Sequence, residues 1–530
     1  MPANIHDLER LLGKAALLLR IGPTQADSLL YRPLVGLGVL QQLPATWPLA
    51  DEINQLPWGA EPLDTPEPDR PSAVDGPWPQ KPVLRSDFPA PVLKIDPADR
   101  DDHVLMNVTR YLGQIMLHTP VAAGLARLGA RVVPVPDDDF QAILTTTAFA
   151  QFLLPIVATA ERKVFAADLA ADPGAVFGTI DLSGFGDFKP LPGVHFAPSV
   201  VLLRQTGDVD WDVVAIRCGD HVFHPGDGSR WELAKYFVLQ GAQCLLVHIA
   251  HPRLHLPLDA LNAITHSLLP SSHRVKRLLA PHFLYTLGLH RALIHHQRGA
   301  THNSQREVSL PFTFQTASMH DGFALGVNGL GTDAYPAYNL FGVHLGGHTE
   351  YGRYRQAWYR HILDFTRKIV ATLEPGDADV TRWADSAAQW VEGFPDGTEI
   401  WRGDVLAETL ATVIATVSVF HTADHDSYSR IPIEQMPFRL RLPPPDASTP
   451  QKIDLARLVL PEDYFRHYLA SRLYFKPVIR TKLSAVTYAF RSSRAKAAAD
   501  EFVTGMQALD RVWGPRGYAT SERIATSVQY

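Results

Sequence analysis

The chain uses very little cysteine, with only Cys218 and Cys244 among its 530 residues. Two cysteines 26 positions apart form neither a disulfide framework nor the thiolate pairs of a zinc finger. Such sparing use is typical of a reducing compartment, because disulfides persist mainly outside the cytoplasm. We therefore predict a cytoplasmic protein.

A strong excess of charge of one sign is also missing. The 49 Lys and Arg residues nearly balance 55 Asp and Glu residues, which leaves a net charge of −6. No part of the chain forms a basic arm, so the composition argues against a nucleic-acid partner. No G-x-S-x-G motif occurs, which excludes the nucleophile elbow of the serine hydrolases.

Long hydrophobic runs are the third absence. No uninterrupted apolar run approaches the roughly 20 residues of a membrane span, so we expect no transmembrane segment. The start, "MPANIHDLERLLGKAALLLRIG", has acidic residues before its apolar part and lacks the basic start of a secretory signal. Contact with a membrane surface stays open as a hypothesis.

Proline, by contrast, is abundant near the start of the chain. After Pro44 the segment up to residue 95 is so rich in proline that long helices are excluded and extended structure is favoured. Trp47, Trp58 and Trp78 favour a segment that docks on the protein rather than a flexible linker, which is the alternative. We predict a strap over residues 1–95, packed on a domain of residues 96–530.

The rest of the chain predicts a mainly α-helical fold. Apolar residues recur every three or four positions in several segments, the pattern of helices that bury one face. The period changes in residues 194–224, where two Val- and Ile-rich runs flank "QTGDVD" and predict a β-hairpin. We read residues 300–400, with their glycine-dense patches, as a mixed, loop-rich insertion. The segments predicted to be helical are residues 101–130, 137–157, 231–251, 404–422, 461–475 and 494–511.

Histidine is concentrated in one part of the chain, since 12 of the 23 histidines fall between His221 and His302. Residues 248–255 read "HIAHPRLH". On a helix His251 and His255 would lie about 40° apart, and two neutral imidazoles so placed can share one metal ion. A zinc protease would need a glutamate at the position of Pro252. A single pair of this kind can also be purely structural.

A second pair, His421 and His425, occurs in "FHTADHDSY", at the end of another nearly all-apolar helix. Two such pairs on buried helices favour four imidazoles that converge on one ion. Such a donor set suits iron, with zinc, manganese and copper as alternatives.

Residues 231–283 resemble the histidine-rich core motif of the lipoxygenases, which are non-heme iron dioxygenases of polyunsaturated fatty acids. Trp231, Ala234 and Lys235 match the start of that motif. The segment "HRVKRLLAPH", from His273 to His282, matches its His-x8-His part. The resemblance covers residues 160–300 and 400–530, and it implies one large helical lipoxygenase-like domain with a small β-hairpin or sheet region. We expect a divergent, bacterial-type member without the N-terminal β-barrel.

The resemblance also implies roles for individual residues. Three histidines and the fourth-ligand position would hold a mononuclear iron, together with the terminal carboxylate after "RIATSVQ". Two further residues would contact the substrate, and three replace polar residues that surround the iron in the family. These sets are His251, His255, His421, His425 and Tyr530 for the metal, His290 and Leu293 for the substrate, and Leu246, Val247 and Tyr428 around the metal.

One departure concerns the spacing of the first pair, which has three intervening residues where the family has four. The longer spacing needs a widened turn, whereas a regular turn could align His251 with His255. Pro252 lacks an amide hydrogen, so we expect a local distortion of the helix there.

The activity implied by the resemblance is hydrogen abstraction from a polyunsaturated fatty acid and insertion of O2, the co-substrate, to give a hydroperoxide of the oxylipin type. A first alternative is an iron-dependent oxygenase on the same fold that acts on another apolar substrate in a biosynthetic pathway. A second is a non-catalytic binding protein. Manganese in place of iron stays open.

Overall fold

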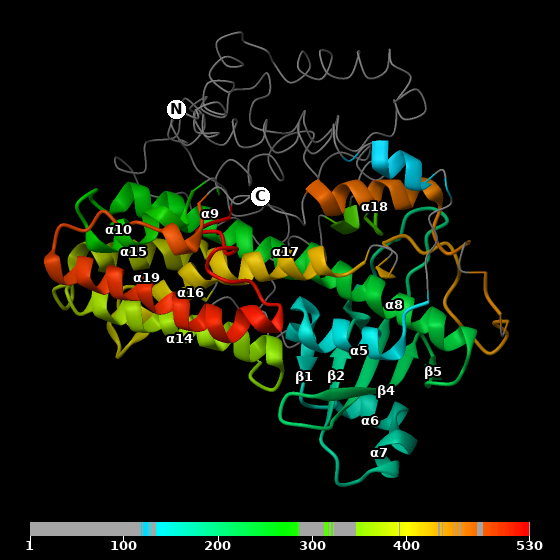
Figure 1. Cartoon of the computed structure of the whole chain (residues 1–530). Coiled ribbons are helices and arrows are strands. Elements are labelled where there is room, and N and C mark those ends of the chain that lie inside the picture. Colours follow the sequence, from blue (N-terminus) through cyan, green and yellow to red (C-terminus); the bar gives the residue numbers. More distant parts are fainter. Residues whose placement is uncertain are drawn as a thin grey trace, which may run out of the picture.

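The computed structural model describes residues 134–286, 346–473 and 481–528, apart from a few positions within them, and short pieces at 118–128 and 312–322. Across these residues the chain is mainly helical, with one antiparallel sheet, as predicted. Figure 1 shows the sheet at one end of a larger group of helices. The predicted strap of residues 1–95 and most of the predicted helix 101–130 lie outside the described residues.

The sheet is a meander in which each strand pairs with the next one in sequence. At its centre is the predicted hairpin, in which Ser199 pairs with Cys218 and Gln205 with Trp211. Alternate residues of its first strand enter two cores: Val201 packs toward the main helical core, and Val200 packs in a smaller one. The strands are β1 (Leu153–Leu154), β2 (Phe177–Asp181), β3 (Ser199–Gln205), β4 (Trp211–Cys218) and β5 (His221–Phe223).

Helices form the other layers of the molecule (Figure 1). Helix α8 packs on the sheet, α14 packs between α16 and α19, and α15 packs on α9. Their bounds are α5 (Asp137–Thr146), α6 (Thr159–Val164), α7 (Ala166–Ala171), α8 (Ser229–Leu245), α9 (His251–Leu268), α10 (Arg274–Leu279), α14 (Glu350–Val370), α15 (Ala378–Trp390), α16 (Val405–Ala415), α17 (His421–Arg430), α18 (Pro461–Leu473) and α19 (Ser493–Trp513).

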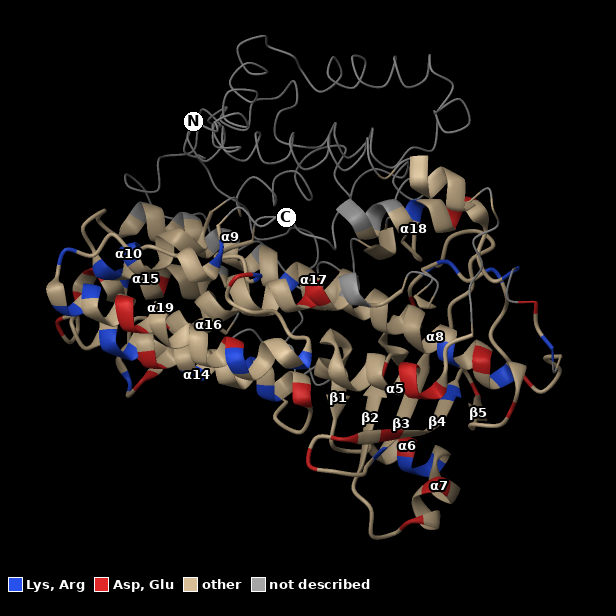
Figure 2. Cartoon of the chain, in the orientation of Figure 1, with Lys and Arg blue, Asp and Glu red and all other residues tan. Residues whose placement is uncertain are grey.

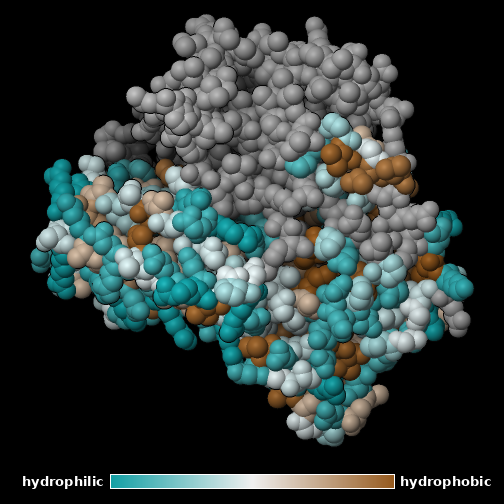
Figure 3. All heavy atoms as spheres, in the orientation of Figure 1, coloured by the Kyte–Doolittle hydropathy of each residue, from teal (hydrophilic) through white to brown (hydrophobic). Residues whose placement is uncertain are grey.

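The interpretation of residues 300–400 as a loop-rich insertion is wrong for the part that the structure describes after residue 346. This part forms the long helices α14 and α15. Tyr351, Tyr354, Trp358 and Ile362 are buried one helical turn apart, and the side of α14 seen in Figure 3 is largely hydrophilic. The sequence carries this helical period, directly after the glycine-dense patch.

The two apolar helices predicted from the sequence each continue past a widened, π-helical turn. Leu246–Ala250 forms this turn between α8 and α9, and Thr416–Phe420 forms it between α16 and α17. In both turns the amide of the next histidine reaches back five residues, from His251 to the carbonyl of Leu246 and from His421 to that of Thr416. Such turns inside long helices are frequent at functional sites.

These two segments are also apolar and long enough to cross a membrane by length and composition alone. They are Ser229–His255 and Val405–Ser427, and 94% and 89% of their most apolar windows are buried in the fold. Core helices of soluble proteins pass the same test, so the observation is weak evidence for a span. Both act here as the central helices of the hydrophobic core.

Candidate metal centre

The two predicted histidine pairs meet where α9 packs on α17. The Nε2 atom of His251 lies 2.8 Å from Nε2 of His255 and 3.1 Å from Nε2 of His425, and Nε2 of His421 lies 3.0 Å from Nε2 of His255. All four ligand atoms lie within 4.8 Å of one another. Four side chains separated by up to 174 positions therefore present their ring nitrogens to one small volume.

These separations fit a shared metal ion. Imidazole nitrogens bind transition metals at about 2.1 Å, so two nitrogens at right angles around one ion lie about 3.0 Å apart. In a tetrahedral arrangement the nitrogens would lie about 3.4 Å apart. The three short separations, 2.8 to 3.1 Å, are closer to the right-angled value than to the tetrahedral one. An imidazole set of this kind suits iron among other first-row metals.

The shortened spacing of the first pair is accommodated by a regular turn, as the sequence suggested. His251 is the first residue of α9, and His255 lies one α-helical turn further along. A widened turn lies directly before Pro252, where we expected a distortion, but the same turn precedes α17, in which the corresponding residue is Thr422. The helix is thus widened ahead of the pair and regular within it.

The surroundings of the four rings are mostly dry. His255, His421 and His425 are buried, whereas the side chain of His251 is 22% exposed. Apolar residues of the core, among them Ala250 and Phe420, flank the pairs along both helices. Burial of this kind keeps water from the nitrogens and strengthens any electrostatic interaction at the site.

A buried carboxylate that the sequence analysis missed faces the cluster. Asp424 lies three positions after His421 on α17, and its Oδ2 is 3.5 Å from Nδ1 of His251. Its Oδ1 accepts hydrogen bonds from Gln151 Nε2 and Tyr351 Oη, each at 3.4 Å. Burial raises the pKa of Tyr351 well above its usual value, so this hydroxyl keeps its proton. A carboxylate at the second nitrogen of a ligating imidazole orients the ring. Its place one helical turn from His421 was a readable signal.

His248, the third histidine of "HIAHPRLH", does not join the four rings. It is fully buried beside Phe312 and Phe314, with ring centroids 5.3 and 5.8 Å apart. Burial lowers its pKa to about 3, which keeps the imidazole neutral at ordinary pH.

The C-terminal segment is held against α17, the helix that carries His421 and His425. The amide of Ala525 donates to Oγ1 of Thr422, the residue after His421, at 3.1 Å. The side chains of Arg523 and Asp426 form an ion pair. His282 Nδ1 donates to the carbonyl of Thr526 at 2.7 Å, and the hydroxyl of Tyr488 donates to His282 Nε2 at 2.9 Å.

Burial lowers the pKa of His282 to about 4, and the bond to the Thr526 carbonyl opposes that shift without cancelling it. The ring is therefore neutral. This gives the last histidine of the His-x8-His motif a tail-holding role that the sequence did not reveal.

The remaining predicted site residues have different outcomes. Leu246 is fully buried in the π-helical turn, and Val247 is partly buried against the core. Tyr428 belongs to α17, but its side chain lies outside the described residues. Tyr530, His290 and Leu293 also lie outside them, so the predicted carboxylate ligand and substrate contacts stay predictions.

Comparison with known proteins gives matches in structure only. No family model matches the chain, and no curated protein matches it in sequence. A calcium-dependent 11R-lipoxygenase superposes with a TM-score of 0.62 at 14% identity, over 82% of this chain and 74% of that one. Coral 8R-lipoxygenase gives 0.62 at 15%, over 82% and 75%. A LOX variant, delta413-417:GS, crystallised anaerobically with arachidonate, gives 0.62 at 17%, over 82% and 74%.

These likenesses extend over four fifths of the chain at identities too low to establish an activity. The described part of this chain is mainly helical with one small sheet. The chain therefore has a divergent lipoxygenase-like fold.

Proposed function

We propose that the protein is a lipoxygenase-like, non-heme iron dioxygenase that converts a polyunsaturated fatty acid to a hydroperoxide. The observation that carries this proposal is the convergence of His251, His255, His421 and His425 within 4.8 Å at the junction of two core helices. The likeness of the fold to lipoxygenases supports it. One of the structures with this fold holds arachidonate, which makes fatty acids the first substrates to test.

In this proposal the four neutral imidazoles hold the metal through their Nε2 atoms. Mononuclear iron at this position would supply hydrogen-atom abstraction and reaction with O2. The carboxylate of Asp424, 3.5 Å from Nδ1 of His251, favours a proton on that nitrogen and so leaves Nε2 of the ring to face the other three. Gln151 and Tyr351 hold the carboxylate in turn. The buried flanks of α9 and α17 keep bulk water away from the reacting carbon.

We further propose that the carboxylate of Tyr530 completes the ligand set. The described tail supports this, because Ala525 is bonded beside His421 and only five residues separate it from the chain end. Five residues of extended chain reach at most about 17 Å. His282 and Arg523 hold the segment that leads to Tyr530 in place.

A second candidate is an iron-dependent oxygenase that acts on another apolar substrate. The surroundings of the histidines favour keeping it. Apolar Leu246 and Val247 stand where the family has polar residues, while the carboxylate of Asp424 contacts His251 directly. Residues around a metal site tune its reactivity, so an altered set is compatible with an altered substrate.

The deciding experiment combines metal analysis with oxygen uptake. We expect purified protein to contain about one iron per chain, and to consume O2 and form a conjugated diene with linoleate or arachidonate. Bound iron without a diene from any polyunsaturated acid would favour the second candidate. A protein that neither contains nor takes up iron or manganese would instead be a binding protein. A cytoplasmic location and contact with a membrane surface are further proposals, for which fractionation of cells is the test.

A further inference from the structure

A pocket of about 280 Å³ lies between the start of α10, the start of α15 and the start of α19. This is the end of the helical region opposite the sheet (Figure 1). None of the pocket's lining residues belongs to the histidine cluster. Helix α9 runs from His251 to Leu268, and a helix of 18 residues is about 27 Å long. The pocket therefore lies beyond the far end of the helix that carries two of the histidines.

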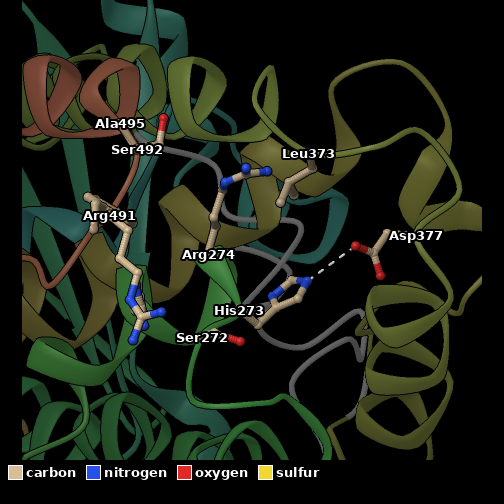
Figure 4. Close-up of a pocket in the computed structure, with 10 residues that line it drawn as sticks. Ser272, His273, Arg274, Leu373, Asp377, Arg491, Ser492 and Ala495 are labelled. Atoms are coloured by element: carbon tan, nitrogen blue, oxygen red, sulfur yellow. Dashed lines mark hydrogen bonds and ion pairs between the residues drawn. The ribbon is translucent and has the colours of Figure 1, made fainter.

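Three arginines line this pocket: Arg274, Arg277 and Arg491. Figure 4 shows Arg274 and Arg491 on different sides of it, from separate segments of the chain. Figure 2 shows further Lys and Arg residues around α10 and the start of α19. Within the part of the chain that the structure describes, no carboxylate forms an ion pair with any of the three. Guanidinium groups gathered without such partners repel one another and raise the affinity of the space between them for an anion.

The hydrogen bonds of the arginines position the side chains and leave donors available. Arg274 donates Nη1 to the carbonyl of Thr372, and Arg277 donates Nε to the carbonyl of Ser271 at 3.0 Å. A guanidinium has five N–H donors, so each keeps several after this single bond. Main-chain carbonyls thus fix the two groups at the pocket without neutralising their charge.

One carboxylate, Asp377, also lines the pocket, but its oxygens are already bonded elsewhere. Oδ1 accepts the amides of Asp379 and Val380 at the start of α15, at 2.9 and 3.4 Å. Oδ2 accepts Nε2 of His273 at 3.3 Å, as the dashed line in Figure 4 marks. Burial raises the pKa of Asp377, but these bonds outweigh that effect and lower it overall, so the group is ionised.

His273 is occupied as well. The amide of Val275 donates to its Nδ1 at 3.2 Å, and its Nε2 is bonded to Asp377. Besides this ring, three guanidinium groups and a single helix-capping carboxylate line the pocket. The balance is about two positive charges, which a doubly charged anion would neutralise.

The shape of the site adds to the argument. Arginine forks match the oxygens of phosphate, and three of them, two from α10 and one from the segment before α19, can surround one phosphate group. The 21-residue helix α19 begins at the rim, where the end of a helix favours an anion. Phe490 and Leu373 give the pocket an apolar wall. Its volume is near the lower end of about 300–1,000 Å³ for small-molecule sites, so it has room for a phosphate with a short organic part.

We propose that this pocket binds a phosphate monoester, whose phosphate lies among Arg274, Arg277 and Arg491 and whose organic part meets Phe490 and Leu373. The monoester comes either from a soluble metabolite or from a lipid headgroup. The proposal is independent of the reaction at the histidines, because it needs no metal and no turnover.

The first test is calorimetric titration of the full chain at low salt with inorganic phosphate and with glycerol 3-phosphate. We expect both to bind, the monoester more tightly. Arg491→Gln should weaken binding roughly tenfold, because a hydrogen bond to a charged group is lost. The double variant, Arg277→Gln with Arg491→Gln, should weaken phosphate binding further. Arg494→Gln is the matched control, because Arg494 is exposed three residues after Arg491, at the start of α19, but does not line the pocket.

The second test separates the two sources of the phosphate. Vesicles of phosphatidic acid and of phosphatidylglycerol, matched in surface charge, are sedimented with the wild type and with the double variant. If the wild type prefers phosphatidic acid and the double variant loses this preference, the ligand is a lipid headgroup. If the wild type binds glycerol 3-phosphate but shows no such preference, the ligand is a soluble metabolite. The proposal fails if the wild type binds neither, or if Arg494→Gln weakens binding as much as Arg491→Gln. Melting curves check that the variants are folded.

Discussion

The two helices that carry the histidine pairs are built alike but supported differently. Each begins directly after a π-helical turn, and each presents two imidazoles four positions apart. Helix α9 contributes a partly exposed ring and a proline in its first turn. Helix α17 contributes two buried rings, the carboxylate that faces His251, and the residues that hold the C-terminal tail. One helix thus supplies ligands, whereas the other supplies ligands and also positions its neighbours.

Removal of one ring from either helix should have the largest effect. We expect His255→Ala and His421→Ala to lower bound iron to less than about a tenth, because each takes away an interior donor from a four-ring set. Elemental analysis of the purified variants measures this. His221→Ala, at an exposed residue of β5, is the control and should keep its iron. Retention of iron by either variant would show that the ring removed is not a ligand.

The C-terminal tail, which contacts α17, should affect iron binding almost as much. Deletion of Tyr530, or a short glycine extension after it, should lower bound iron and oxygen uptake, because the terminal carboxylate is removed or displaced. Tyr530→Ile is the matched control: it changes the side chain, keeps the carboxylate at the chain end and should retain iron. Unchanged iron in the extended protein would refute the carboxylate ligand.

Asp424, the carboxylate of α17 that faces His251, gives a sharper test of the difference between α9 and α17. Asp424→Asn should weaken iron binding about 10- to 100-fold, because the partner that orients His251 loses its charge. Competition with a chelator measures the affinity. Asp426→Asn, on the same helix, should act mainly on stability through its ion pair with Arg523. Equal losses of affinity in the two variants would mean that Asp424 has no specific effect on the ring.

Acid should destabilise the fold through the buried histidine that holds the tail. The pKa of His282 is about 4 in the folded protein and near 6.5 when exposed, so the unfolded chain binds more protons between these values. Its contribution is complete above about pH 6.5 and is lost as the pH falls toward 4, by about 2 kcal/mol between pH 7 and 5. Denaturant unfolding of apo protein at both pH values should show a smaller loss for His282→Gln. Burial also lowers the pKa values of His248 and His467, to about 3. These two residues therefore destabilise the wild type and His282→Gln alike as the pH falls.

The smallest effects concern the second residue of each histidine helix. Pro252 lacks an amide, but the π-helical turn before it already interrupts the regular hydrogen bonding there, so Pro252→Ala should change the free energy of unfolding by less than about 1 kcal/mol. Thr422 holds the same place in α17 and accepts the amide of Ala525, so Thr422→Val should cost about 1–2 kcal/mol. Denaturant unfolding measures both. A larger cost for the proline would contradict the proposed difference between the helices.

Much of this arrangement could be predicted from local pattern. The apolar period placed the central helices, the Val- and Ile-rich runs placed the β3–β4 hairpin, and the four-residue spacing placed each histidine pair on one helical face. Prediction failed where the signal was not local. The sequence places Asp424 one turn from His421, but the packing of α9 on α17 is what brings it to His251. The arginine pocket joins segments more than 200 positions apart.

By itself, the sequence determined which residues could act as ligands and which helices would be buried, because helical periodicity and side-chain chemistry are properties of neighbouring residues. The tertiary structure decided that the two pairs meet at separations suited to one ion, and that Asp424 rather than His248 accompanies them. It also decided that His282 holds the tail. These outcomes depend on how distant helices pack, and packing is determined by the whole core.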